Sequence, residues 1–415
     1  MRFLPLLAAL FLAAPITAQN APATPPQVLF QTYDAYRVPY RIPAIATTRK
    51  GHLLALVDRR YCYLDIGYGK IDQVLRISKD NGLTWGPDTV IQRGSGVEGS
   101  HDCGYGDPAI VADRTSNRVL CLSVTGNVIY IKGTRANPNR IARWYSEDGG
   151  RSWTAAEDIT DQFYRMLPNT RTMFVGSGRI MQSRVVKTGK YYRLYCSVLT
   201  RTQMGSEDVA CNYVLFSDDF GQNWDVLGAS RLDGYDSPCV GGDEPKTEEL
   251  PNGDVILSSR KWYGRYFNIF HFTDIQSDNR RGQWGQCVAS HDVEGGIKTG
   301  ATSCNGEILL VDAKEAGTGR AVKLMLQSLP FGDKRTDVGI WYKEILPAGI
   351  YSPLAFAHNW TQGLQVSHTT SAYSTMIPQR DGRIAFFWEE LETDNGYNMV
   401  YQPLTIAEIT EGRYE

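Results

Sequence analysis

Arg41 places a permanent positive charge inside a segment that otherwise predicts a buried β-strand. The run from Tyr40 to Ile45 reads YRIPAI, with apolar residues on the C-terminal side of the arginine. A buried charge is costly unless it is paired, so Arg41 needs either a partner or a site open to water. Other chemistries lack their motifs: the six histidines show no HExxH arrangement and no GxSxG occurs. This speaks against divalent-metal hydrolases and serine esterases.

Three copies of one eight-residue string carry an aspartate at the same position, Asp80, Asp148 and Asp219. The copies are SKDNGLTW (78–85), SEDGGRSW (146–153) and SDDFGQNW (217–224), with an eroded fourth in SDNRRGQW (277–284). In such a string the aspartate accepts backbone N–H bonds within a tight turn, the glycine supplies a positive φ, and the tryptophan packs the turn onto nearby strands. We therefore expect these aspartates to be structural. Their spacing of about 70 residues predicts a repeated fold unit.

Short apolar segments bounded by Gly, Asn, Asp or Pro fill the chain between these strings and predict strands. Examples are GHLLALV (51–57), VLCLSV (119–124), YYRLYCSVL (191–199), DVILSSR (254–260), VKLMLQS (322–328) and RIAFFWE (383–389). A helical turn or two is expected only around TAAEDITDQF (154–163). The fold class is therefore all-β. Repeats of about 70 residues predict a β-propeller of six four-stranded blades, and a β-solenoid, whose period is much shorter, fits poorly.

The N-terminus predicts a targeting segment followed by one domain. Arg2 precedes the apolar run FLPLLAALFLAAP, and Ala18 is a small residue before the expected cut, the pattern of a signal peptide. We expect a signal peptide at 1–18, a linker at 19–26, and a single propeller domain at 27–415. The alternative is a buried N-terminal helix. The expected location is secreted or periplasmic, with attachment at the cell surface left open.

Composition excludes some partners. The chain has 415 residues, 42% of them hydrophobic, and a formal net charge of −2, so a large core is expected and a nucleic-acid partner, which favours a basic excess, is not. No later segment approaches the roughly 18 apolar residues of a membrane-spanning helix.

Eight cysteines follow the expected cut. None lies in a CxxC or Cys/His spacing suited to zinc, so no metal site is expected. Export would permit disulfides. The strings YYRLYCSVL and VACNYVLF flank a polar turn centred near Gln203 and Met204, which predicts Cys196 and Cys211 opposite each other in a hairpin. A disulfide and two free thiols both remain open.

The repeated string resembles the Asp box of the bacterial sialidases, which also occurs in unrelated secreted β-propellers. The YRIP run makes the resemblance more specific. Sialidases open their catalytic domain with an Arg-Ile-Pro strand some forty residues before the first Asp box, and Arg41 precedes Asp80 at a similar distance. The resemblance continues through the mature chain and implies a retaining exo-α-sialidase that cleaves terminal sialic acids through a tyrosyl-linked intermediate.

The resemblance implies three arginines that bind the substrate carboxylate, which suits the planar, bidentate guanidinium better than lysine. The first is Arg41. The second is Arg260, which follows Glu244 within GGDEPKTEELPNGDVILSSRKW, and the third is Arg335 in SLPFGDKRTDVGIWYKEI. The match at Arg335 is the loosest of the three.

The implied nucleophile is a neutral tyrosine, since a carboxylate nucleophile would be repelled by the substrate's own carboxylate, and sialidases are a known exception in this respect among glycosidases. The segment SAYSTMIPQRDGRIAFFWEE matches the family's Tyr-Ser strand and later glutamate. It implies Tyr373 as nucleophile, Glu244 as its base, and Glu389 as the residue that orients Arg41. Glu390 is the alternative if the register differs by one residue.

The remaining implied roles belong to segments near Arg41 and Asp107. LVDRRYCYLDIGYGK resembles the family's Asp-x-Arg and Asp-x-Gly stretch, which implies Asp65 as the acid/base and Arg60 as a contact of the sugar O4, with Arg59 as the alternative. GYGDPAIVAD implies a further O4 contact at Asp107. The segment VGSGRIMQSR departs from the family's Gly-rich pattern at Ser177 and Arg179, so no substrate contact is assigned there.

The expected function is thus hydrolysis of sialylated glycoproteins, glycolipids or oligosaccharides, without cofactor or metal. Two alternatives keep an enzyme: a trans-sialidase, and a hydrolase of a related 2-keto sugar acid. A third is a non-catalytic Asp-box propeller that binds glycans. It predicts a broken Asp/Glu/Tyr set, whereas Asp65, Glu244 and Tyr373 are all present.

Overall fold

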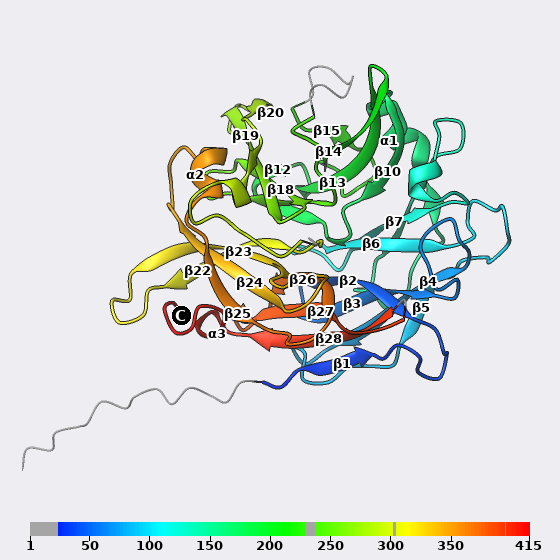
Figure 1. Ribbon diagram of the computed structural model, residues 1–415, viewed down its shortest axis with the longest axis horizontal. Coiled ribbons are helices and arrows are strands. Elements are labelled where there is room, and N and C mark those ends of the chain that lie inside the picture. The colour runs from blue at the N-terminus through cyan, green and yellow to red at the C-terminus, as the bar shows by residue number, and fades with distance from the viewer. Residues whose placement is uncertain (1–23, 229–236, 302–303, 395) are drawn as a thin grey trace, which may run out of the picture.

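The computed structural model describes residues 24–228, 237–301, 304–394 and 396–415 (Figure 1). These ranges contain 28 strands and three short α-helices, α1 Thr160–Met166, α2 Pro353–Ala357 and α3 Ile406–Ile409. None of these helices has the length and apolar character needed to cross a membrane. The helix expected within 154–163 begins late, at Thr160, because the two-residue strand β9, Glu157–Asp158, precedes it.

The described strands form five sheets, the largest of which joins the two ends of the chain. Its two halves meet only through the residue pair Tyr40↔Tyr397. The first strand also pairs with the last, so the N-terminal and C-terminal segments lie side by side in Figure 1. One half contains β2 Tyr40–Thr47, β3 Leu53–Arg60, β4 Ile71–Ser78 and β5 Thr89–Gln92, and the other contains β26 Ser371–Pro378, β27 Ile384–Thr393, β28 Gly396–Leu404 and β1 Gln27–Phe30.

The other four sheets follow one another along the chain, and their strands pair antiparallel except for β11 with β6. The second contains β6 Tyr105–Ala112, β7 Val119–Thr125, β8 Arg140–Ser146, β9 Glu157–Asp158 and β11 Gly178–Arg179; the third contains β10 Thr170–Val175, β12 Met181–Thr188, β13 Tyr191–Met204, β14 Glu207–Ser217, β15 Asp225–Val226 and β16 Cys239–Val240. The fourth contains β17 Pro245–Glu249, β18 Val255–Lys261, β19 Gly264–Asp274, β20 Asp278–Trp284 and β21 Val288–Ala289; the fifth contains β22 Ile308–Lys314, β23 Ala321–Pro330, β24 Val338–Ile345 and β25 Thr361–Gln365.

This succession of sheets confirms the all-β prediction. Buried side chains of neighbouring sheets pack against each other; Leu122 of β7 and Leu194 of β13, for example, belong to one core cluster. Hydrogen bonding gives five sheets among the described residues, and the largest contains two four-stranded groups. The count of six blades therefore stays a prediction.

The three complete Asp boxes form the expected turns. In the second, Asp148 Oδ1 accepts hydrogen bonds from the backbone N–H of Arg151, the backbone N–H of Ser152 and Ser146 Oγ, all at 2.9 Å. Burial is the largest single influence and raises the pKa of Asp148, but the hydrogen bonds together outweigh it and lower this pKa to about 2. The eroded fourth copy differs: residues 278–284 form strand β20, not a turn. This copy lacks the central aspartate, because Asn279 stands in its place.

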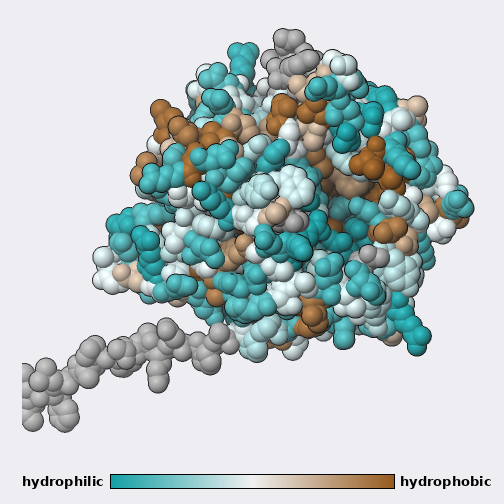
Figure 2. Space-filling model, viewed as in Figure 1, coloured by the Kyte–Doolittle hydropathy of each residue, from teal (hydrophilic) through white to brown (hydrophobic). Residues whose placement is uncertain are grey.

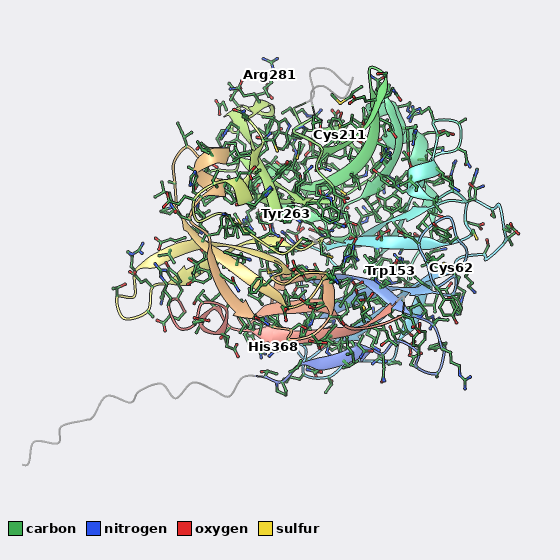
Figure 3. The ribbon with its side chains drawn as sticks, in the orientation of Figure 1. Cys62, Trp153, Cys211, Tyr263, Arg281 and His368 are labelled. Carbon is green, nitrogen blue, oxygen red and sulfur yellow. The ribbon has the colours of Figure 1, made fainter. Side chains whose placement is uncertain are left out.

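The predicted Cys196–Cys211 pairing is wrong. The hairpin exists, but its turn lies between Met204 and Glu207, so that Cys196 pairs with Leu215 and Cys211 pairs with Thr200. Cys211, labelled in Figure 3, lies in β14, and both thiols are free. A turn two residues later than expected moves the two cysteines four positions out of register.

Replacing the aspartate of an Asp box should destabilise the fold. We expect Asp148→Ala to lower the free energy of unfolding by about 1–3 kcal/mol, because two backbone N–H groups and two hydroxyls lose their acceptor. Urea denaturation measures the change. The control is Asp312→Ala, which removes an exposed ion pair with Lys323 and should change stability by less than about 1 kcal/mol. Equal effects of the two variants would contradict a structural role for the box.

Candidate active site

The Arg41 guanidinium is fixed by a buried carboxylate from the other end of the chain. Arg41 Nε donates to Glu389 Oε1 at 2.8 Å and Nη2 donates to Oε2 at 3.3 Å. Glu389 is fully buried, whereas the Arg41 side chain is 15% exposed. Burial opposes the charge on Arg41, yet Glu389 holds the pKa of the guanidinium above its ordinary value. Arg41 is thus paired on one side and open on another, and its partner is Glu389, not the neighbouring Glu390.

Glu389 also joins two strands through their backbones. Its Oε1 accepts the N–H of Ile42 at 2.7 Å and its Oε2 accepts the N–H of Tyr373 at 3.1 Å. The first contact depends on a bulge in β2, where Ile42 has φ 60° and the pairing register shifts between Arg41 and Ala44. A positive φ is a genuine outlier for a β-branched residue. Here it aims the N–H at the carboxylate instead of at the neighbouring strand.

Tyr373 and Glu244 form a hydrogen-bonded pair beside Arg260. The Tyr373 hydroxyl donates to Glu244 Oε1 at 2.5 Å, and Arg260 Nη1 contacts Glu244 Oε2 at 2.7 Å and the Tyr373 oxygen at 3.2 Å. The backbone brings Glu244 and Arg260 together, because Arg260 N–H donates to the Glu244 carbonyl at 3.0 Å, next to the β17–β18 ladder. The separation of these two residues in the sequence is therefore the span of one hairpin.

The electrostatics place the shared proton on the tyrosine. Burial and the charge of Glu244 raise the pKa of Tyr373 well above its ordinary value, although Arg260 and Arg335 act in the opposite direction. Burial also tends to raise the pKa of Glu244, but Arg260 and the Tyr373 hydrogen bond hold it below its usual range. At neutral pH the pair is therefore a neutral phenol bonded to an ionised carboxylate. This is the ground state of a nucleophile with an adjacent base.

All three arginines predicted to bind a carboxylate surround Tyr373. Arg41 and Arg335 have their guanidinium carbons 5.5 Å and 5.6 Å from the centre of the Tyr373 ring, and Arg260 contacts its hydroxyl. Arg335 comes from the loop between β23 and β24, where its φ of 61° marks a tight turn. Among the groups that raise the pKa of Arg335, buried Cys304 has the largest effect. Three guanidinium groups therefore converge on one phenol.

A second cluster lies around Arg60, next to the first. Its Nη2 lies 2.8 Å from Asp58 Oδ2, 3.4 Å from Asp65 Oδ1 and 3.9 Å from Asp107 Oδ1. Asp65 is on the loop between β3 and β4 and its side chain is 49% exposed. Arg41 lies near enough to act on the pKa of Arg60, so the two clusters belong to one site.

Alternation along β3 separates the two adjacent arginines. Arg59 points away from the cluster, stacks on Tyr36 with its guanidinium carbon 4.0 Å from the ring centre, and lies 3.6 Å from Asp72. Successive side chains of a strand face opposite sides, so Arg59 and Arg60 cannot both face the cluster. Arg60 is the one that meets Asp65 and Asp107.

Asp107 is held in an unusual state. It is 5% exposed, has φ 52°, and its Oδ2 has no hydrogen-bond partner. Burial, together with the charges of Asp65 and Asp58, raises its pKa well above the ordinary value, while Arg60 opposes this. A buried carboxyl with a free oxygen at the edge of a charged cluster suits a polar ligand that supplies the missing partner.

Some residues of the site were not predicted from the sequence. Asp58 is fully buried and carries two hydrogen bonds from Arg60; the Asp58-x-Arg60 spacing, two residues on one face of a strand, was its available signal. Tyr397 stacks on Arg41, with the guanidinium carbon 5.1 Å from the ring centre. Fully buried Arg265 donates to the carbonyl groups of Ser258 and Cys304 beneath the site. Neither Tyr397 nor Arg265 had a signal in the sequence.

The surroundings are polar. A hollow of about 180 Å³ beside the site is lined by Asp243, Arg260, Lys261 and Trp262, among others. The face of the molecule in Figure 2 is largely hydrophilic, with its hydrophobic residues in scattered groups.

In the described part of the chain no three His, Cys, Asp or Glu side chains are grouped to hold a metal ion. Arg179, which was left unassigned, pairs with buried Glu248 at 2.8 Å and is structural.

Relatives of the chain are sialidases. The sialidase of Micromonospora viridifaciens is 31% identical over 234 residues, covering 53% of this chain and 32% of the relative. The sialidase of Paraclostridium sordellii is 26% identical over 315 residues, covering 66% of this chain and 64% of the relative. The chain thus spans less than two thirds of the length of these relatives. No protein-family model matches it.

Several solved structures with a similar fold are sialidases or trans-sialidases. The Hadza microbial sialidase Hz136 superposes with a TM-score of 0.67 at 20% identity, covering 90% of this chain and 66% of that one. The intramolecular trans-sialidase of Ruminococcus gnavus superposes with a TM-score of 0.64 at 15% identity, covering 89% and 95%. At this identity the likeness shows the fold, and it confirms the predicted β-propeller. The sequence relatives are thus bacterial sialidases, the family that the Asp boxes and the Arg-Ile-Pro strand resemble.

Proposed function

We propose that this protein is a retaining exo-α-sialidase that releases terminal sialic acids from glycoconjugates through a Tyr373-linked intermediate. One observation carries the proposal: the Tyr373 hydroxyl donates to ionised Glu244 within a ring formed by Arg41, Arg260 and Arg335. A neutral nucleophile with its own base, placed among fixed cations, suits attack on an anomeric carbon that carries a carboxylate.

The arginines hold the substrate carboxylate. Their guanidinium groups stay charged at every relevant pH, and Arg41 is aimed by Glu389 before the substrate arrives. Binding therefore costs little reorganisation, because the site is already arranged for an anion. The same cations stabilise the phenolate character that develops on Tyr373 as it attacks.

Glu244 removes the phenolic proton during the attack. Because burial keeps the pKa of Tyr373 above its ordinary value, the phenol does not ionise without a base, and the hydrogen bond of 2.5 Å to Glu244 provides the transfer path. Arg260 contacts Glu244 Oε2 and the Tyr373 oxygen. It therefore stabilises the negative charge both on Glu244 before the proton transfer and on the tyrosine oxygen after it. The proton thus moves from Tyr373 to Glu244 and the negative charge moves from Glu244 to Tyr373, while Arg260 stays in contact with both groups.

Asp65 protonates the leaving oxygen and then activates water for the second step. Its half-exposed position on the β3–β4 loop gives it access to a glycosidic bond at the mouth of the site. Arg60 and Asp107 lie next to it and bind a hydroxyl of the sugar, since the raised pKa of Asp107 gives this carboxyl donor capacity. The mechanism uses only side chains and water.

The proposed substrates are sialylated glycans outside the cell, reached by export through the N-terminal leader. Transfer of the intermediate to another sugar or to an internal hydroxyl would use the same residues. Mass spectrometry of the products from a sialylated oligosaccharide separates these outcomes: free sialic acid supports the hydrolase, and a sialylated acceptor or an anhydro sugar supports a transferase.

Removing the nucleophile or the acid should give different kinetic signatures. We expect Tyr373→Phe to lower the release of sialic acid from an aryl sialoside by about 10³-fold or more. Asp65→Ala should lower turnover of sialyllactose by about 10²-fold or more, and turnover of the aryl sialoside much less, because an aryl oxide leaves without a proton.

Tyr351→Phe is the matched control for the tyrosine, because it removes a hydroxyl that bonds only the Leu346 carbonyl in a distant loop. It should keep full activity. Circular dichroism should show that each variant keeps its fold. Wild-type rates in both Tyr373→Phe and Asp65→Ala would overturn the assignment.

Arg41→Lys should weaken the site without removing its charge. The ammonium of lysine lacks the fork that bonds Glu389 and a substrate carboxylate together, so we expect kcat/KM to fall by about 10- to 100-fold. Steady-state kinetics on sialyllactose measures it. Arg49→Lys, beyond the opposite end of the same strand, conserves charge in the same way and should leave kcat/KM unchanged. A similar loss in both variants would show a general effect of the substitution.

Removing the carboxylate that orients Arg41 should cost stability as well as activity. Glu389→Ala leaves a buried cation and two backbone N–H groups without acceptors, and breaking such a buried pair costs about 3–5 kcal/mol of unfolding free energy. Glu389→Gln keeps one acceptor and should lose less. Glu390→Ala, the adjacent control, should change the free energy by less than about 1 kcal/mol. Urea denaturation compares the three, and a larger loss in Glu390→Ala would refute the role of Glu389.

A further inference from the structure

Cys239 approaches strand β19 from one side. It lies in β16, where it pairs with Asn212 of β14, and it is 1% exposed. The preceding residue, Pro238, is tied to β19, because Asn268 Nδ2 donates to the Pro238 carbonyl at 2.7 Å. The position of Cys239 is therefore fixed by contacts with the third and fourth sheets at once.

Cys287 approaches β19 near the same residue. It immediately precedes Val288 of β21, which pairs with Phe267, the residue before Asn268 in β19. Its side chain is partly exposed and packs on the core cluster that contains Cys239. The two cysteines thus come from separate segments and meet beside Asn268.

The two thiols interact within this cluster: Cys239 raises the pKa of the Cys287 thiol, while the Cys239 thiol is affected in the opposite direction. The contact with Cys287 holds the pKa of the Cys239 thiol below its usual range; burial opposes this, while Ser259 and the charge of Lys261 act in the same direction as Cys287. A thiol with a lowered pKa beside a second, more accessible thiol is the arrangement that thiol–disulfide exchange requires.

We propose that Cys239 and Cys287 form a disulfide when the protein reaches an oxidising compartment. Both thiols are free in this structure. Cys287, the more accessible thiol, loses its proton and attacks one sulfur of the disulfide of an oxidant, a protein dithiol oxidoreductase or oxidised glutathione, which forms a mixed disulfide and releases the other sulfur as a thiol. The Cys239 thiolate then attacks the Cys287 sulfur and displaces the oxidant as a thiolate. Two electrons and the two cysteine protons pass to the oxidant, which leaves with two thiols.

The disulfide would pin the segment that enters the active site. Gly242 follows Cys239 closely, and a side-chain carbon placed on it would lie 2.7 Å from the Cys239 sulfur and 2.4 Å from Asn212 Oδ1. Glu244 comes two residues later. A crosslink at Cys239 therefore anchors the chain just before Glu244 to the β19–β21 edge and closes a loop of about 50 residues, which restricts the unfolded chain.

Peptide mapping of the secreted protein, alkylated before digestion without reductant, tests the proposal. We expect one crosslinked peptide that joins Cys239 to Cys287, and an intact mass that rises by about 2 Da on reduction. The proposal is overturned if both cysteines are alkylated after treatment with oxidised glutathione. It is also overturned if Cys239 is joined to the nearby Cys211 instead.

Thermal melting with and without reductant gives a second readout that does not depend on sialidase activity. Reduction should lower the Tm of the wild-type protein by roughly 5 °C or more. The shift should vanish in Cys287→Ser and persist in Cys103→Ser, which replaces a buried cysteine elsewhere. A shift that persists in Cys287→Ser would refute the crosslink. Should the serine variant fail to fold, the peptide map of the wild-type protein still decides.

Discussion

The buried ion pair of Arg41 and Glu389 is the interaction on which the site depends. Two charges removed from water are tolerated only when their remaining donors and acceptors are satisfied. Glu389 meets this condition with four hydrogen bonds: two go to the guanidinium, one to the backbone of β2 and one to the backbone of β26. The pair therefore fixes the direction of Arg41 and the spacing between Arg41 and Tyr373 with a single carboxylate.

The rest of the site is a balance of charge around one phenol. Burial and Glu244 keep the proton on Tyr373, whereas Arg260 and Arg335 favour its loss. Opposed influences of this kind leave the phenol neutral at rest, next to a carboxylate that can accept its proton. The second cluster has its own balance, in which Arg60 faces the carboxyl groups of Asp58, Asp65 and Asp107.

What the sequence could predict depended on whether local chemistry or tertiary pairing decides the outcome. The Asp-box turn is made within eight residues, so its aspartate, glycine and tryptophan were readable. Arg41 stood out because an arginine in an apolar strand needs an explanation. By contrast, the hairpin of β13 and β14 turns two residues later than its polar residues suggested, and Cys196 and Cys211 do not meet. The contact between Cys239 and Cys287 joins two segments about 50 residues apart, and no local pattern marks it.

The alternation of side chains along a strand explains a further part of what the sequence could not predict. Adjacent Arg59 and Arg60 look alike in the sequence, yet the strand sends one to Tyr36 and the other to Asp65. The bulge at Ile42 is likewise a feature of the backbone that the residue types do not predict. Residue types identified the candidate chemistry, and the register of strands determined which neighbour takes part.

The pairing of Tyr40 with Tyr397 closes the largest sheet from both ends of the chain. Arg41 and Glu389 lie beside that closure, 348 residues apart in the sequence. The first guanidinium of the site therefore has no partner until the last strands are made and docked. The site is therefore complete only once strands from both ends of the chain have docked, and a partly synthesised chain that lacks β27 carries Arg41 without the carboxylate that orients it.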